Sequence, residues 1–439
     1  MNIKTKQYAK ELLNIALPII MGNIGFILIG AGDVLIAGRH STDTLAAISI
    51  AAAISNCIMT FGIGLIASVS PLLSNFRGAK KAAKKYLFPT IRFAMSLAAI
   101  TAVVVLAFVP VIDLMGFEAK LVPAIKNYMI ITAFATFGGY LHAALKEYLQ
   151  AFEIVLFPNL LTVFCIFLNI LLNYILVFGF GHIPSLGVTG LAIASFIVRY
   201  VMGFTLLIYC FMIMTCRNYR DKDYYKKLIQ IGLPISFAVL VEFVAFNSIA
   251  IFMGRISGIY AAAQNLICTL TTVSFMVPLA ISNAIAVKVG FANGAKQYIE
   301  LKNYSIIGII MSVCFMTCSA VVFCSFPEFL AGLFTKDAIL IKISIPILYI
   351  LAIFQIFDGL QVALSGIYKG IKKTKIVLLA NIFGYWIISV PLGYWLAFYK
   401  QYNLLGFWYG LLCAAVALCS FMLIMLFKYL KKIKTEFSL

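Results

Sequence analysis

Residues 231–253 read IGLPISFAVLVEFVAFNSIAIFM and contain a single charged side chain, Glu242. A helix rises about 1.5 Å per residue, so this run is long enough to cross the roughly 30 Å hydrocarbon core of a bilayer. Lipid offers the backbone no hydrogen-bond partners, and a continuous apolar run therefore predicts a helix rather than a barrel strand. The stretch predicts a transmembrane helix and raises the question of why it contains a carboxylate.

The rest of the chain has the same character. Its composition is 63% hydrophobic and 11% charged, with a mean hydropathy of +1.05, whereas soluble domains carry about a quarter charged residues. We predict an all-α polytopic membrane protein whose first apolar run is an uncleaved span rather than a signal peptide. The twelve expected spans are about 12–38, 45–75, 86–115, 122–150, 157–180, 187–214, 228–254, 260–291, 303–333, 340–371, 376–399 and 405–429.

The net charge of +19 is distributed between loops. Most Lys and Arg residues lie at the termini and in the even-numbered loops, for example in 217–227 and 369–375. The positive-inside rule therefore predicts a cytoplasmic (inner) membrane protein with both termini in the cytoplasm. A basic patch for nucleic acid is not expected, because the charge does not collect on one soluble domain.

The chain contains an internal repeat, because its second half aligns with its first half at an offset of 216 positions. Leu17-Pro18 falls on Leu233-Pro234, and Gly78-Ala79-Lys80 falls on Gly294-Ala295-Lys296. Six spans per half is an even number, so the two halves enter the membrane in the same sense as parallel repeats. We expect an N-lobe at 1–215, a cytoplasmic linker at 216–227 and a C-lobe at 228–439. Paired bundles of this kind are typical of transporters that alternate access by rocking.

Three carboxylates lie within apolar spans: Asp33, Glu242 and Asp358. A charge near the bilayer centre costs about 2.5–3.5 kcal/mol on insertion scales, which makes each one a functional-site hypothesis. The alternative is a packing role with hydrogen bonds across the bundle. The repeat does not pair these residues, so each half has acquired its own polar centre.

Glu242 and Asp358 fall in the same half, where two carboxylates can share a proton or coordinate Na⁺. Inward movement of one positive charge releases about 2.3 kcal/mol per 100 mV of membrane potential. We predict that these two residues couple cation entry to solute export.

Asn169 and Asn173 are one turn apart on the fifth expected span and share a face. With Ser195 of the sixth span they form a possible cation or substrate site beside Asp33, or else simple interhelical hydrogen bonds. Arg199 lies within the sixth expected span. It could neutralise the charge of Asp33 or extend its side chain toward the edge of the membrane, but we favour a structural role. Pro18 lies in the first helical turn or, if it is deeper, is a bending point.

Catalytic machinery is not expected. The histidines and cysteines form no metal-type or nucleophile spacing, and no phosphate-binding glycine loop is present. The sequence therefore predicts no enzyme activity, no ATP drive and no cofactor or metal beyond a transported Na⁺ or H⁺.

Several motifs together resemble the multidrug and toxic compound extrusion (MATE) family along the whole chain. They are GDVLIAGRHSTDTLAAISI (32–50), LNILLNYILVFG (168–179), LGVTGLAIAS (186–195), FMVPLAISNAIAVKVG (275–290), DGLQVALSGIYKGIKKTK (358–375) and YWIISVPLGY (385–394). Three positions depart from the family pattern: Gln264 replaces a frequent His, Phe354 a Na⁺-ligating tyrosine, and Lys369 an arginine.

The resemblance implies a MATE-type fold of the multidrug/oligosaccharidyl-lipid/polysaccharide (MOP) superfamily, with two six-helix lobes. It matches Asp33, with Asn169 and Asn173 nearby, to the N-lobe acidic site. It matches Glu242 and Asp358 to the C-lobe pair of the NorM-like branch, which uses Na⁺ or sometimes H⁺. Pro18 matches a proline linked to bending of the first helix.

We expect a monomeric antiporter, embedded in membrane lipid, that exports small amphipathic organic cations. The related alternative is a flippase for lipid-linked saccharides, whose cavity needs several cationic groups. The alternative from another class is a passive channel, whose flux does not depend on a driving ion.

Overall fold

The computed structural model describes residues 3–182, 184–214 and 219–436. The first half of the chain forms α1 (Ile3–His40), α2 (Thr42–Ile66), α3 (Val69–Gly78), the 3₁₀ helix η1 (Ala83–Tyr86), α4 (Leu87–Phe108), the 3₁₀ helix η2 (Val109–Leu114), α5 (Val122–Gln150), α6 (Leu156–Phe178) and α7 (Gly187–Ile213). The second half forms α8 (Lys222–Gly254), α9 (Gly258–Gly294), α10 (Tyr298–Ser325), α11 (Pro327–Gly332), α12 (Ala338–Gly370), α13 (Lys375–Asn381), the π-helical η3 (Ile382–Ser389), α14 (Val390–Tyr394), the π-helical η4 (Trp395–Tyr399) and α15 (Asn403–Glu436).

Twelve helical stretches among the described residues are long and apolar enough to cross a membrane, which confirms the predicted number of spans. Some are less regular than predicted. The second span breaks between α2 and α3. The ninth ends at Ser325, because the residue before Pro327 is pushed out of the helical region; Phe326 has φ −132° and ψ 45°. The eleventh contains π-helical turns on both sides of α14, whose second residue is a proline without an N–H.

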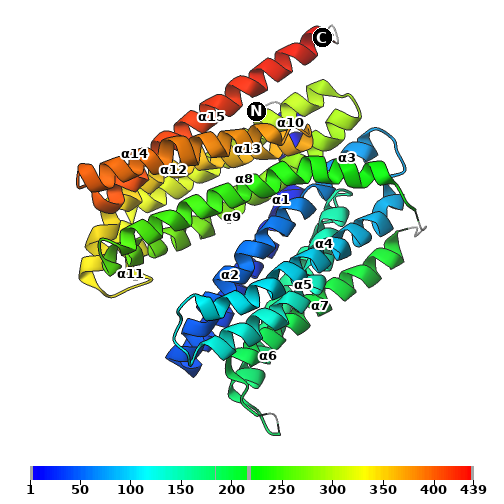
Figure 1. The fold of residues 1–439 in the computed structure, drawn as a ribbon. Helices are drawn as coiled ribbons and strands as arrows, with labels where there is room; N and C mark the ends of the chain where they lie inside the picture. Colours follow the sequence, from blue (N-terminus) through cyan, green and yellow to red (C-terminus); the bar gives the residue numbers. More distant parts are fainter. Residues whose placement is uncertain (1–2, 183, 215–218, 437–439) are drawn as a thin grey trace. The chain divides into compact units, whose positions relative to one another are not determined.

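Packing divides the chain into two compact units. Unit 1 combines Met1–Leu17 with Phe237–Leu439, and unit 2 is Pro18–Ser236. In unit 2, α5 is the central helix and packs along α2, α4 and α7; in unit 1, α12 packs along α9, α10 and α15. Figure 1 shows α2 to α7 in blue to green, and α9 to α15 from green through yellow to red.

The two units differ from the predicted lobes in where they place the beginnings of α1 and α8. In unit 1, the Glu11 carboxylate accepts hydrogen bonds from Lys288 Nζ at 3.1 Å and from Tyr304 Oη, and Leu12 beside it is fully buried. These contacts fix the first turns of α1 among α9 and α10. Of the predicted linker 216–227, residues 216–218 lie outside the described residues, and α8 already begins at Lys222.

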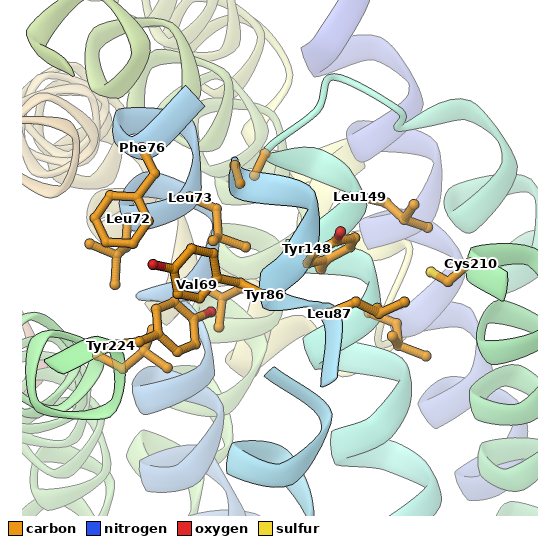
Figure 2. Packing of buried hydrophobic residues seen from close by; sticks show 14 of the residues in the cluster. Val69, Leu72, Leu73, Phe76, Tyr86, Leu87, Tyr148, Leu149, Cys210 and Tyr224 are labelled. Atoms are coloured by element: carbon orange, nitrogen blue, oxygen red, sulfur yellow. The ribbon is translucent and has the colours of Figure 1, made fainter. Parts of the chain in front are cut away.

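The first turns of α8 pack into unit 2 (Figure 2). The ring centroids of Tyr224 and Tyr86 are 4.6 Å apart, and the Tyr224 hydroxyl lies 2.7 Å from Thr90 Oγ1. Further along, Ser236 Oγ donates to the Phe61 carbonyl at 2.7 Å. Burial of these aromatic side chains holds the beginning of α8 in unit 2, because full burial of one such side chain stabilises the folded state by about 1.5–3 kcal/mol.

The repeat recurs in the local geometry of the two halves. Ser41 caps α2 by accepting from the Thr44 N–H, and Ser257, its partner in the repeat, caps α9 by accepting from the Ile259 N–H. Both serines are extended, with φ −166° and −164°. An N-cap of this type stabilises a helix by about 1 kcal/mol. The equivalent helices α2 and α9 therefore begin with the same local signal.

Small residues allow α9 and α12 to approach closely at the centre of unit 1. A Cβ added to Gly366 would lie 2.4 Å from the Ser282 carbonyl oxygen. The Ser282 hydroxyl donates to the Val362 carbonyl at 2.7 Å. Close backbone packing of this kind is how helices associate in lipid, where neighbouring helices and acyl chains are equally apolar.

Candidate functional site

Glu242 lies near the middle of α8 and is held by two donors from the eleventh span. Asn381 Nδ2 donates to Glu242 Oε2 at 3.3 Å, and Tyr385 Oη donates to Oε1 at 3.2 Å. Asn381 and Tyr385 are one turn apart and therefore face the same side. Asn381 is itself fixed, because its amide also donates to the Ala238 carbonyl at 3.2 Å. The half-buried carboxylate is thus met by polar partners in an otherwise apolar span.

Asp358 lies on α12 and is only 3% exposed. One turn before it, the Phe354 ring lies 6.3 Å from that of Phe246, which follows Glu242 by one turn on α8. The two predicted carboxylates therefore lie on neighbouring stretches of α8 and α12 within unit 1. Gln361, one turn along α12, joins Asp358's helix to the donors of Glu242. Its amide nitrogen lies 3.2 Å from Tyr385 Oη and 3.4 Å from Asn381 Oδ1.

An aromatic cluster adjoins these carboxylates. The ring centroids of Phe354 and Trp408 are 5.7 Å apart at a right angle, and Phe246 lies 6.3 Å from Phe354 and 5.9 Å from Tyr385. Trp408 Nε1 donates to Gln264 Oε1 at 3.0 Å, which gives the fully buried glutamine a partner. Phe354 is 1% exposed and packs in this cluster, so it brings no oxygen to the site.

The second predicted site lies within unit 2, where Asp33 of α1 meets α6 and α7. Asn173 Nδ2 donates to Asp33 Oδ1 at 2.6 Å and to Asn169 Oδ1 at 3.1 Å, and Ser195 Oγ donates to Asp33 Oδ2 at 3.3 Å. The structure therefore brings together all four residues that were predicted for this site. Among the described residues, Asn169 Nδ2 and Asn173 Oδ1 have no partner although both side chains are fully buried.

Arg199 lies one turn after Ser195 on α7. Its Nη1 is 3.7 Å from Met59 Sδ, and no carboxylate within the described ranges forms an ion pair with it. Ser195 itself donates a hydrogen bond to Asp33. The guanidinium therefore lies on the helix that borders the Asp33 site and forms no ion pair with Asp33 among the described residues.

Pro18 lies well inside α1, which continues unbroken from Ile3 to His40. Of the two readings open from the sequence, the interior position is the observed one. A proline there removes one backbone hydrogen bond of the helix. Pro18 is also the residue at which the chain passes from unit 1 to unit 2.

Sequence reasoning missed Asn381 and gave no role to Gln361 and Tyr385, although both belong to quoted motifs. The spacing of four between Asn381 and Tyr385 was the available signal, since it places both polar groups on one helix face. Among the described residues no group of three or more His, Cys, Asp or Glu side chains could hold a metal ion. The Glu242 site contains two carboxylates and the Asp33 site contains one, each with amide and hydroxyl groups nearby. This set of oxygen ligands suits a proton or a hard cation.

Comparison with known proteins assigns the family. The MatE family model matches residues 18–175 and 234–395, and its two matches begin at Pro18 and Pro234, the prolines paired by the internal repeat. A probable multidrug resistance protein NorM of Photorhabdus laumondii is 29% identical over 92% of this chain and 91% of its own. A probable multidrug resistance protein NorM of Bacillus subtilis is 25% identical over 94% of both chains.

Solved structures share the fold. A mutant of the Vibrio cholerae MATE transporter VcmN superposes with a TM-score of 0.91 at 19% identity and covers 98% of this chain and 99% of its own. The eukaryotic MATE transporter AtDTX14 gives a TM-score of 0.86 at 18% identity, over 98% of this chain and 99% of its own. The chain is therefore a NorM-like member of the MatE family, a multi-pass membrane transporter and not an enzyme.

Proposed function

We propose that this protein is a secondary active multidrug efflux antiporter that exports amphipathic organic cations in exchange for inward Na⁺ or H⁺. The observation that carries the proposal is the site in unit 1, where Glu242 and Asp358 lie on neighbouring stretches of apolar spans and Glu242 is oriented by Tyr385 and Asn381. The relatives named as multidrug resistance proteins support the substrate class.

A bound cation offsets the cost of placing two acidic groups in the membrane. When the cation is absent, the Tyr385 hydroxyl and the Asn381 amide stabilise the Glu242 carboxylate through hydrogen bonds. When Na⁺ or H⁺ binds, it takes the place of these donors. Entry of one charge at 100 mV releases about 2.3 kcal/mol, which sustains roughly a 50-fold gradient of a neutral solute. One-for-one exchange with a monovalent organic cation moves no net charge, so its drive is the concentration gradient of Na⁺ or H⁺.

The Asp33 site serves as a substrate contact or as a second cation site. Hydrogen bonds join Asp33, Asn173, Asn169 and Ser195 into one polar cluster, and Asn173 Oδ1 is free to accept a donor or ligate a cation. The Asp33 carboxylate supplies negative charge that attracts an organic cation. The positive charge of Arg199 offsets part of that negative charge.

Further parts of the proposal rest on the family and on the charge pattern. The protein acts as a monomer in the cytoplasmic membrane, with both termini in the cytoplasm as the basic loops predict. Rocking of the two lobes alternates access, and transport uses neither ATP nor a bound cofactor.

The test is ethidium efflux from proteoliposomes under a Na⁺ gradient and, separately, under a pH gradient. Efflux driven by Na⁺ alone assigns Glu242 and Asp358 as Na⁺ ligands and makes Phe354 a tolerated change. Efflux driven by pH alone makes the carboxylates proton carriers and brings Asp33 into the coupling. Failure under both gradients favours a flippase, and efflux independent of either ion favours a channel.

Neutralising variants test the assignment of residues. Glu242→Gln and Asp358→Asn are each expected to abolish gradient-driven efflux in folded protein. Glu328→Gln removes an exposed carboxylate of α11 in the same unit and is the matched control. Normal driven efflux by both site variants would refute the coupling role.

A further inference from the structure

A cavity of about 580 Å³ lies beside the turn that follows α3 in unit 2. Its lining includes Arg77, Lys81, Lys84, Lys85, Ala82 and Phe152. The second span ends at Gly78 and the third begins at Ala83, so this cavity lies where two spans reach the edge of the membrane. Its walls combine four cationic side chains with alanine and aromatic surface.

Only one of these cations has a carboxylate partner within the described part of the chain. Arg77 forms an ion pair with Glu153. The ammonium of Lys81 lies over the Phe76 ring at 5.2 Å from its centroid, and that of Lys85 over the Tyr219 ring at 4.1 Å. Contacts with ring faces orient an ammonium group without neutralising it. The cavity therefore carries an excess of three positive charges.

The fold does not need these basic residues, because the repeat builds the same turn without them. Lys80 and Lys296 are equivalent and have φ of 56° and 57°. The residue after each donates its N–H back to the preceding helix at 2.9 Å, Lys81 to Phe76 and Gln297 to Ala292. The second half has other residues where the first has Arg77, Lys81, Lys84 and Lys85, namely Asn293, Gln297, Glu300 and Leu301.

We propose that this cavity binds the phosphate-bearing headgroup of an anionic phospholipid. Unpaired lysines at the end of a span attract anionic headgroups, and basic pockets beside spans bind them specifically. The volume lies within the range of small-molecule sites and far exceeds a single inorganic phosphate. Phe152 and Ala82 offer apolar surface to the glycerol and first acyl carbons. The site is independent of the carboxylates proposed for transport.

The repeat also suggests a variant that should fold. Lys81→Gln with Lys84→Glu installs the residues that the second half carries at the same turn. The matched control is Lys222→Gln with Lys226→Glu, which removes the same charge from two exposed lysines of α8 that do not line the cavity. Ala82→Trp fills the cavity and leaves every charge in place.

The measurement is native mass spectrometry of the full chain in detergent, titrated with phosphatidylglycerol or with phosphatidylcholine of the same acyl chains. Wild type and the control are expected to prefer phosphatidylglycerol. Loss of each lysine weakens an anionic surface contact roughly fivefold, so the cavity variant should bind phosphatidylglycerol at least about 25-fold more weakly. Ala82→Trp should weaken it as well.

Three results would overturn the proposal. Equal weakening in the cavity and control variants would mean that general positive charge attracts the lipid. Wild-type binding by Ala82→Trp would exclude the cavity itself. Thermal stabilisation by inorganic phosphate equal to that by phosphatidylglycerol would assign the cations to a free anion rather than to a lipid.

Discussion

Replacing Asn381 by aspartate tests the geometry around Glu242 most directly. The Asn381 amide nitrogen lies 3.3 Å from Glu242 Oε2. Asn381→Asp exchanges this donor for a second carboxylate oxygen at nearly the same distance. With an effective dielectric constant of about 20, two unit charges 3.3 Å apart repel each other by about 5 kcal/mol. A proton shared between the carboxyls reduces this cost, so the value is an upper limit.

A second substitution should reverse the loss. Glu242→Gln in the Asn381→Asp background removes one charge and supplies an amide donor to the new carboxylate. We expect the double variant to recover all but about 1–2 kcal/mol, since the remaining bonds of residue 381 to Ala238 and Gln361 are only partly kept. The single variant should unfold at a clearly lower temperature than the double variant, although it carries fewer changes.

Thermal unfolding in detergent measures both variants. Unit 1 has about 220 residues, and domains of that size shift by roughly 2–4 °C per kcal/mol. The upper limit for Asn381→Asp is therefore a Tm about 10–20 °C below wild type. The reasoning would be refuted if the single variant melted with wild type, or if Glu242→Gln brought no recovery, because either result means that the two side chains do not face each other.

Other perturbations have equally definite outcomes. Gly366→Ala overpacks against α9 and should lower the free energy of unfolding by about 1–3 kcal/mol, whereas Gly30→Ala meets nothing within 4 Å and should raise it by about 0.5–1 kcal/mol; denaturant titration compares them. Asn173→Ala removes the 2.6 Å hydrogen bond to Asp33 and should weaken ethidium binding about tenfold by fluorescence titration; unchanged binding would exclude this site as a substrate contact. Hydrogen bonds that the Lys120 ammonium donates to Asp43 and Glu118 raise the pKa of Lys120, so any stabilising contribution is complete at neutral pH and is lost only as pH rises through that pKa. Because these groups are exposed, that contribution is too small to detect, and Lys120→Gln should leave the Tm at pH 7 unchanged.

Structural features that depend on local sequence patterns could be predicted from the sequence. Twelve apolar runs give twelve spans, and the spacing of Asn169 and Asn173 placed both amides on one face before any contact was known. Asn381 could not be found in this way, because its role depends on the eleventh span lying against α8. Its spacing from Tyr385 places both polar groups on one helix face but does not say which helix that face meets. An asparagine in a span can also bond its own helix, as Asn247 does by donating to the Phe243 carbonyl at 2.7 Å.

The same limit applies to the packing units. The repeat predicts where equivalent residues recur, but not that the beginnings of α1 and α8 pack outside their own half. That outcome depends on tertiary contacts such as Glu11 with Lys288 and Tyr224 with Tyr86, which join residues far apart in sequence.

The membership of α1 in both units has a consequence for biosynthesis. Unit 2 is contiguous and has its complete set of partners once the ribosome has passed Ser236. Residues 3–17 are synthesised before unit 2, yet the rest of unit 1, including Lys288 and Tyr304 that bind Glu11, lies beyond residue 236. The first turns of α1 therefore remain without these partners until the second half of the chain has been made. A coexpressed pair of fragments divided after Ser236 would leave unit 2 with its full core, whereas division after residue 215 would remove Tyr224 and the turns around it.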